Sequence, residues 1–212
     1  FIISRRGTIV GNDFVAECEY VFPKDKLKGM NLPEVYNEIQ SYPDMWMGAW
    51  IFTISKEYMY SKDLFFYPGL LHEDEEWVPR VFFGGGIIAY NNSLLYINRP
   101  DRTGSITTVP NIKRLFDKLF IVDRLAQIFT SVVYADDVLD SIERRRTAIV
   151  FGVIVELGKY HRFDRFDELV NIIKRNIGLL KKSKRKLYKV VFISVKTIGV
   201  YRTSVLLGKF QK

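Results

Sequence analysis

Apolar residues in the second half of this chain recur at spacings of three and four, which is the period of an α-helix. The pattern runs through residues 112–134 and continues over 136–157 and 164–180. It predicts three consecutive helices, each with an apolar face that must be buried against a neighbour. The chain has 212 residues, of which 48% are hydrophobic, so it is long enough to bury a sizeable core.

The first half mixes shorter segments of both kinds. Turn residues and apolar runs predict irregular strands in residues 1–22, a buried strand at 45–54 and two short strands, 87–90 and 94–98, joined by Asn91-Asn92. Capping signals predict helices at 32–42 after Asn31, from Ser55, and at 73–82 before a run of three glycines. Residues 186–210 fit neither the period of a helix nor that of a strand clearly, because β-branched residues stand between scattered bases.

Charge divides the chain unevenly. Twelve bases and no acid follow Glu168, which leaves 20 bases and 24 acids in residues 1–168. The body is therefore mildly acidic although the whole chain has a net charge of +8. We expect the two parts to have different electrostatic roles.

Cysteine content and hydropathy limit the cellular setting. Cys18 is the single cysteine, which excludes an internal disulfide and suits a reducing compartment. No apolar run reaches the roughly 20 residues of a membrane span. The chain begins with Phe1 inside an expected strand, so we expect it to be part of a longer protein.

An acidic cluster, Glu73 to Glu76, follows a Pro68-Gly69 turn and has aromatic and aliphatic residues on both sides. Acids at the start of a helix most often complement its dipole. An apolar frame and neighbouring like charges can also raise the pKa of a carboxylate toward the range of a general base. Both interpretations stay open on the cluster alone. A zinc-binding helix is excluded here, because Glu76 occupies the position of the second histidine.

Four further motifs stand in a recognisable order around this cluster. A Trp-containing apolar segment and an F-x-x-G turn precede it, and L-Y-x-x-R (residues 95–99) and R-x-G-S-I (residues 102–106) follow it before the long helix. Over residues 46 to about 125 this order resembles the acceptor-side half of glycosyltransferase family 2, the inverting sugar transferases with the GT-A fold.

The resemblance implies a fold and a division into domains. It implies an α/β chain, in which residues 1–110 form the acceptor-side part of a GT-A, Rossmann-like domain and residues 111–212 form a mainly helical C-terminal region with a basic tail. The family's D-x-D motif, which holds a divalent Mn²⁺ or Mg²⁺ on the donor diphosphate, has no counterpart in this sequence. We therefore expect the metal ligands and the nucleotide-binding half to lie outside this chain, which alone would be inactive.

The resemblance also implies roles for individual residues. It makes Asp74 the catalytic base, with Glu73 as its neighbour or the second candidate for that role, and it gives His72 either an acceptor contact or a helix-capping role. The acceptor would also contact Trp46, Gly48 and Trp50, although core packing is an alternative for both tryptophans. The donor diphosphate would be bound by basic and small residues of the following loop: Arg102 first, then Arg99 and Ser105.

The substrates implied are a nucleotide-sugar donor and a glycan or lipid-linked acceptor, used in bacterial surface polysaccharide biosynthesis. Enzymes of this kind work in the cytoplasm or peripherally at the inner face of the membrane. We accordingly expect residues 174–212 to contact an anionic membrane rather than nucleic acid, although aromatic residues do lie between the bases. The alternative is a non-enzymatic basic module that binds nucleic acid or membrane through this tail.

Overall fold

The chain forms two compact units in the computed structural model, and each is described by itself. The first unit contains residues 1–69 and 73–109, and the second contains Leu70–His72 and Pro110–Lys212. The structure describes residues 2–10, 13–15, 24–41, 48–98, 111–130 and 134–209. The expected domains, 1–110 and 111–212, remain a prediction, but the short segment Leu70–His72 packs with the C-terminal unit.

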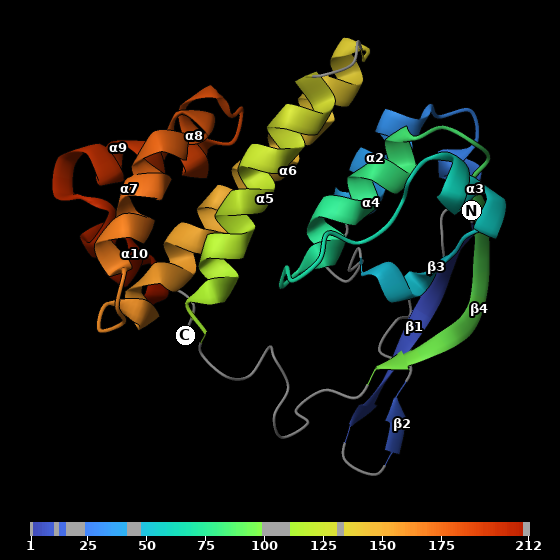
Figure 1. The fold of residues 1–212 in the computed structure, drawn as a ribbon, viewed down its shortest axis with the longest axis horizontal. Coiled ribbons are helices and arrows are strands. Elements are labelled where there is room, and N and C mark those ends of the chain that lie inside the picture. Colours follow the sequence, from blue (N-terminus) through green and yellow to red (C-terminus); the bar gives the residue numbers. More distant parts are fainter. Residues whose placement is uncertain are drawn as a thin grey trace. The chain divides into compact units, whose positions relative to one another are not determined.

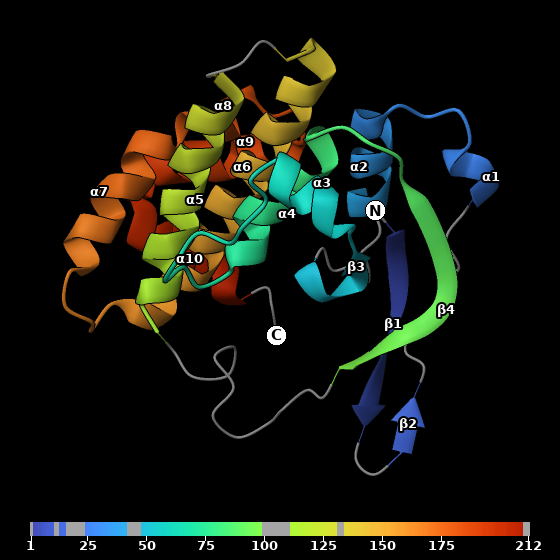
Figure 2. The same cartoon turned by 45° about the vertical axis from the view of Figure 1, so that its right-hand side comes forward.

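The first unit contains a small mixed sheet built around β1 (Ile2–Val10), drawn in blue in Figure 1. Strands β2 (Asp13–Val15) and β3 (Phe52–Thr53) pair antiparallel with opposite ends of β1. Strand β4 (Ala89–Asn98) pairs with β1 in parallel, and the two lie side by side in Figure 2. Strands β2, β3 and β4, which lie far apart in sequence, thus each pair with β1.

Helices of the first unit begin where capping chemistry predicts. In α2 (Leu32–Ser41) the Asn31 side chain accepts a hydrogen bond from the Glu34 amide at 2.9 Å, and Glu34 accepts one from the Asn31 amide at 2.8 Å. This reciprocal pair is a capping box. Ser55 likewise caps α3 (Lys56–Ser61) by accepting from the Tyr58 amide at 3.0 Å. The remaining helices here are α1 (Lys24–Leu27), α4 (Glu73–Phe83) and the 3-10 turn η1 (Ala49–Ile51).

The core of the first unit lies between α2, α4 and the segment around β3. Tyr36 of α2 packs edge-on against Phe82 of α4, with ring centroids 5.2 Å apart. Phe52 of β3 packs against the same Phe82 ring at 6.0 Å. Tyr36 and Phe82 are almost completely buried. Helix α4 therefore contributes one apolar face to this core.

The glycine run after α4 packs closely against Tyr58 of α3. The Tyr58 hydroxyl donates to the Val81 carbonyl at 2.8 Å, and a Cβ added to Gly84 would lie 2.7 Å from that hydroxyl and 2.8 Å from the Arg80 carbonyl oxygen. Gly85 and Gly86 have φ of 91° and 95°, a region that other residues rarely adopt. The run therefore ends α4 and makes room for the Tyr58 ring.

Gly84→Ala should destabilise the protein by about 1–3 kcal/mol, because the added methyl overlaps both the phenol and the carbonyl. Gly152→Ala is the matched control: this helical glycine has open space around it, and alanine should stabilise the helix by up to about 1 kcal/mol. Urea unfolding of the two variants checks the difference. Equal midpoints would contradict the close packing at Gly84.

Burial raises the pKa of Tyr90, on β4, to about 12. In the unfolded chain the same side chain has a pKa near 10. Between pH 10 and 12 the hydroxyl is therefore ionised in the unfolded chain but not in the folded one, and ionisation favours unfolding. The stability that this group contributes is complete below pH 10 and is lost as the pH rises through 12. Titration of the absorbance at 295 nm should show a late tyrosinate step that Tyr90→Phe removes; an unchanged late step would contradict this assignment.

The second unit consists of helices among its described residues, drawn from yellow-green to red in Figure 1. The long pair α5 (Lys113–Thr130) and α6 (Asp136–Leu157) pack on each other through residues such as Leu119 and Val150, which are fully buried. The shorter elements that follow are η2 (Gly158–Tyr160), α7 (Phe166–Asn176), α8 (Gly178–Lys182), α9 (Lys186–Ile198) and α10 (Val200–Lys209).

The expectation of an α/β, Rossmann-like fold is wrong, because the described residues are mainly helical. A Rossmann-like domain alternates strands and helices along a mostly parallel sheet. Here β1 and β4 form the one parallel pair among the described strands, β2 and β3 have three and two residues, and only helices follow residue 110 in the described part. The protein is therefore classified as mainly helical.

Two local predictions are also corrected, and one segment that the sequence left open is assigned. The two strands expected at 87–90 and 94–98 are one strand, β4, in which the Asn91 side chain accepts from the Ser93 amide and the register shifts beside it. The asparagine turn signal produces a bulge because pairing with β1 continues past it. The buried strand expected at 45–54 is reduced to η1 and β3 in its described part. The ambiguous residues 186–210 form two helices.

Candidate active site

The acidic cluster lies on the first turn of α4, as the sequence predicts. Pro68 and Gly69 form a turn, with Gly69 at φ 78°, and the helix begins at Glu73. All four acids belong to this turn, where the unpaired amides and the helix dipole favour negative charge. Local structure alone thus explains why acids are tolerated at this position.

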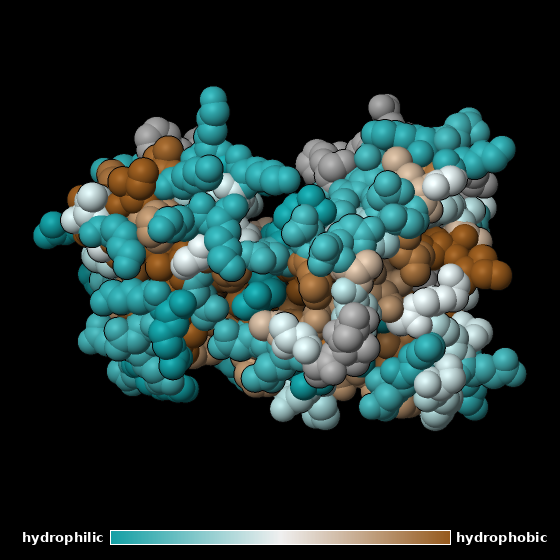
Figure 3. Space-filling model, turned by 90° about the horizontal axis from the view of Figure 1, so that it is seen from above, coloured by the Kyte–Doolittle hydropathy of each residue, from teal (hydrophilic) through white to brown (hydrophobic). Residues whose placement is uncertain are grey.

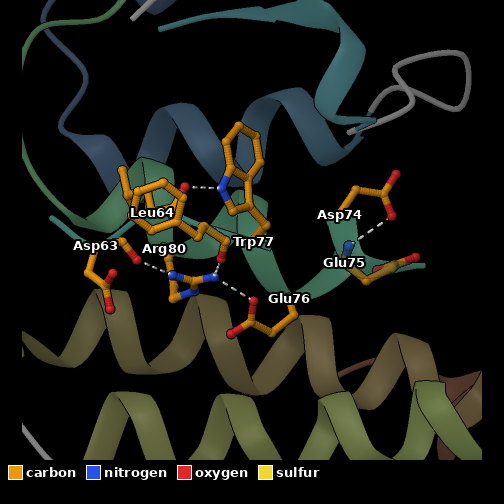
Figure 4. Close-up of polar contacts among 8 residues, drawn as sticks. Asp63, Leu64, Asp74, Glu75, Glu76, Trp77 and Arg80 are labelled. Carbon is orange, nitrogen blue, oxygen red and sulfur yellow. Dashed lines mark hydrogen bonds and ion pairs between the residues drawn. The ribbon is translucent and has the colours of Figure 1, made fainter. Parts of the chain in front are cut away.

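The four acids do not share one environment. The first three, Glu73, Asp74 and Glu75, are partly exposed, whereas Glu76 is completely buried. A carboxylate oxygen of Asp74 accepts a hydrogen bond from the Glu75 amide at 2.9 Å, which fixes the side chain at the helix start (Figure 4). Asp74 is therefore held in place and partly exposed to solvent, and a general base needs both a fixed position and access to its substrate.

Glu76 pairs with Arg80 one turn later on α4. The distance between the Arg80 Nη2 and a Glu76 carboxylate oxygen is 2.8 Å. The same guanidinium donates to the carbonyls of Asp63 at 3.0 Å and Phe65 at 2.5 Å (Figure 4). These hydrogen bonds from Arg80 hold the loop that contains Asp63 and Phe65 against α4. Asp63 has φ 49°, which shows that this loop is held in an uncommon backbone conformation.

Trp77 fixes the same loop from the neighbouring position. Its indole N–H donates to the Leu64 carbonyl at 2.9 Å in a buried position, and Figure 4 shows this bond beside the Arg80 contacts. Trp77 also packs against Phe52 of β3 and Phe66 of the loop. The first turn of α4 is consequently held by polar and apolar contacts within the first unit.

His72 has a left-handed backbone, with φ 63°, at the position just before α4. For a non-glycine residue such a conformation is strained, and strain of this kind is often found at functional sites. Its Nε2 accepts a hydrogen bond from the Arg114 Nε at 3.2 Å within the second unit, which leaves the ring proton on Nδ1. The predicted roles of acceptor contact and helix cap are not distinguished by this bond.

Polar contacts with α5 and α6 orient the segment Leu70–His72. The Leu71 amide donates to the Asp117 carboxylate at 2.8 Å, and Lys113 pairs with the same nearly buried carboxylate. Glu156 of α6 in turn pairs with Arg114 at 3.7 Å and Lys118 at 3.0 Å. The residue that precedes the acidic cluster is therefore fixed by a charged network.

The predicted acceptor residues Gly48 and Trp50 lie close together in the first unit. A Cβ on Gly48 would overlap the Trp50 indole, so the space beside this glycine is filled by that ring. Trp50 is partly exposed, and one of its faces stacks on Tyr96 of β4 with centroids 4.5 Å apart. The structure thus brings together an aromatic pair that includes a residue, Tyr96, not singled out by the sequence pattern.

The other predicted site residues, Trp46, Arg99, Arg102 and Ser105, lie outside the described residues. Within the described ranges no three His, Cys, Asp or Glu side chains form a group that could hold a metal ion. The predicted diphosphate and metal sites therefore remain predictions.

Sequence reasoning missed the partner of Glu76 in the first unit and the partners of the segment Leu70–His72 in the second. The spacing of Glu76 and Arg80, four apart on a helix, could have indicated their ion pair. Asp117 and Arg114 gave no such signal, because they meet the segment Leu70–His72 from a distant helix.

Comparison with protein families, curated proteins and solved structures finds no match to this chain. None of the helices in the described part of the chain has the length and hydropathy to cross a bilayer.

Proposed function

We propose that this chain supplies the acceptor-activating part of an inverting glycosyltransferase. One observation carries the proposal: the first turn of α4 presents Asp74 as a positioned, accessible carboxylate while Glu76 of the same turn is buried and paired. Acidic residues that serve only to keep a surface soluble do not require a buried ion pair, such as Glu76–Arg80, or a fixed loop next to it. The order of motifs around the cluster supports the same function.

In the proposed reaction an acceptor hydroxyl attacks the anomeric carbon of a nucleotide sugar. Asp74 takes the hydroxyl proton, the new glycosidic C–O bond forms, and the bond between the anomeric carbon and the diphosphate oxygen breaks with its electron pair leaving on the nucleoside diphosphate. Displacement from the opposite face inverts the anomeric centre. Glu73 is its neighbour and the second candidate for the base.

The remaining substrate contacts follow the motif resemblance. Arg102, with Arg99 and Ser105, would stabilise the charge that develops on the leaving diphosphate. His72, Trp46 and the Trp50–Gly48 segment would contact the acceptor. A divalent Mn²⁺ or Mg²⁺ would bind the donor diphosphate through residues outside these 212, and would neutralise charge on it.

We place this activity in the cytoplasm or at the inner face of the membrane, in the assembly of a bacterial surface polysaccharide. The acceptor class is a glycan or a lipid-linked glycan.

Sugar transfer by the natural polypeptide that carries this sequence tests the proposal. UDP- and dTDP-sugars with Mn²⁺ serve as donors and octyl glycosides as acceptors, with proton NMR to identify the anomeric configuration of the product. We expect transfer with inversion. The isolated 212 residues are the comparison, and they should neither bind donor in calorimetry nor transfer sugar. A folded natural polypeptide that uses none of these donors, or a retained configuration in the product, would overturn the proposal.

A further inference from the structure

Helices α9 and α10 form a hairpin at the end of the second unit. Gly199 separates them with φ 87°, and its amide donates to the Val195 carbonyl at 3.1 Å. The hydroxyls of Ser194 and Thr203 hydrogen-bond across the pair at 3.0 Å. Gly158 donates to the Ser204 hydroxyl at 2.6 Å, which ties α10 to η2. The hairpin is thus part of the packed unit rather than a free tail.

One face of α9 faces the core of the unit. Tyr188, Val191 and Val195 follow one another at spacings of three and four, and all three are buried. The Tyr188 ring packs against Phe151 of α6 with centroids 4.8 Å apart. This face accounts for the folding of α9, so the remaining apolar residues of the helix are not needed for its packing.

The opposite face of α9 carries a second apolar row in contact with solvent. Leu187, Val190 and Ile193 recur at a spacing of three, with exposed fractions of 53%, 60% and 59%. Large exposed residues continue beyond this row in the hairpin: Ile198, Tyr201, Val205 and Leu206. Single exposed apolar residues are ordinary, but a contiguous exposed row indicates a binding surface. Figure 3 shows hydrophobic residues between hydrophilic ones on this unit.

Exposed bases accompany this row. Lys186 and Val190 are four residues apart on the helix, as are Lys189 and Ile193, so each lysine lies one turn from an exposed apolar side chain. Lys196, Arg202 and Lys209 are exposed as well. Among the described residues no base of α9 or α10 forms an ion pair, and neither helix contains an acid. The described residues of these two helices therefore present exposed apolar and basic side chains and no acidic ones.

We propose that the α9–α10 hairpin is a docking surface for an anionic lipid membrane. Leu187, Val190 and Ile193 would enter the boundary between head groups and acyl chains, while the lysines beside them extend to the phosphates. Helix α9 has 13 residues and a length of about 20 Å, so it lies along the interface rather than across it. This inference does not depend on the catalytic role of Asp74.

The chemistry of the row favours a membrane over other partners. Single-stranded nucleic acid is bound by aromatic rings that stack on nucleobases, whereas the most exposed apolar residues of this hairpin are aliphatic. A second copy of the same face would bring its bases against equal charges. An anionic bilayer satisfies both the apolar row and the positive charge.

Vesicle binding tests the proposal. The full chain is mixed with phosphatidylcholine vesicles containing about 30% phosphatidylglycerol and, separately, with pure phosphatidylcholine vesicles. We expect binding to the anionic vesicles that weakens when NaCl rises from about 0.1 M to about 0.5 M. Binding should persist in Asp74→Asn, which separates this surface from the proposed active site.

Two double variants of α9 identify the surface. Val190→Gln with Ile193→Gln should weaken vesicle binding at least about tenfold, because both side chains lose apolar burial. Lys186→Gln with Lys189→Gln should weaken it about fivefold for each base removed. The controls are Ile87→Gln, an exposed apolar residue of the first unit, and Lys174→Gln with Arg175→Gln on α7, which remove the same charge. Both should bind almost as the unchanged protein does.

The proposal is overturned by an absence of vesicle binding, by equal losses in the α9 variants and their controls, or by tighter salt-sensitive binding to a single-stranded oligonucleotide. It is also overturned if light scattering shows a dimer that the Val190/Ile193 variant dissociates. Circular dichroism checks that the variants stay helical, which the exposure of both residues leads us to expect.

Discussion

Asp74→Asn should reduce sugar transfer by about 10²–10⁴-fold, because the amide cannot take the proton of the acceptor hydroxyl. The substitution keeps the size of the side chain and an oxygen that can accept the Glu75 amide hydrogen bond. The start of α4 should therefore keep its structure. Initial rates of the natural polypeptide with saturating nucleotide sugar report this loss, and donor titration of the same polypeptide by calorimetry should give an unchanged affinity.

Glu75→Gln is the matched control for this variant. It removes one carboxylate from the same helical turn and from a partly exposed side chain, so it changes the local charge equally. We expect its transfer rate to stay within a few-fold of the unchanged protein. Similar large losses in both variants would assign the effect to the charge of the turn rather than to a base. Loss of donor binding in Asp74→Asn would contradict its role as base.

Arg80→Leu should destabilise the first unit by about 3–5 kcal/mol, because it leaves Glu76 as a buried carboxylate without this cationic partner. The carbonyls of Asp63 and Phe65 lose their donors in the same step. The three tryptophans, Trp46, Trp50 and Trp77, all belong to the first unit by position, so tryptophan fluorescence in urea follows this unit alone.

The double variant Glu76→Leu with Arg80→Leu separates the ion pair from simple loss of packing. Removing both charges also takes away the buried carboxylate that has lost the Arg80 guanidinium, so most of the lost stability should return. The part that does not return, about 1 kcal/mol for each carbonyl, corresponds to the loop hydrogen bonds. Lys28→Leu, at an exposed base of the first unit, should change stability by less than about 0.5 kcal/mol. If Arg80→Leu lowered the free energy of unfolding as little as Lys28→Leu does, the ion pair would not be what holds the site.

Local signals predicted the parts of the site that depend on neighbours in sequence. The capping residues Asn31 and Ser55 and the acids at the start of α4 determine helix starts, because each side chain or charge acts within one turn of its own backbone. The spacing of apolar residues likewise predicted α5 and α6 to within a few residues. These features do not require the rest of the chain.

The fold class and the environment of each acid required tertiary structure. The sequence does not indicate that Asn91 and Asn92 continue a strand, because pairing with the distant β1 decides this. Equally, four consecutive acids look alike in sequence, yet Glu76 alone among them is buried, and it pairs with Arg80 one turn later.

The sequence by itself determined where the helices of residues 112–180 run and which turn carries the acids, because helical period and capping are local. The tertiary structure alone decided that the protein is mainly helical rather than α/β, that residues 186–210 form helices, and that α9 has an exposed apolar row. Side-chain burial and strand pairing depend on residues far apart in the chain, so they cannot be predicted from a pattern of neighbouring residues.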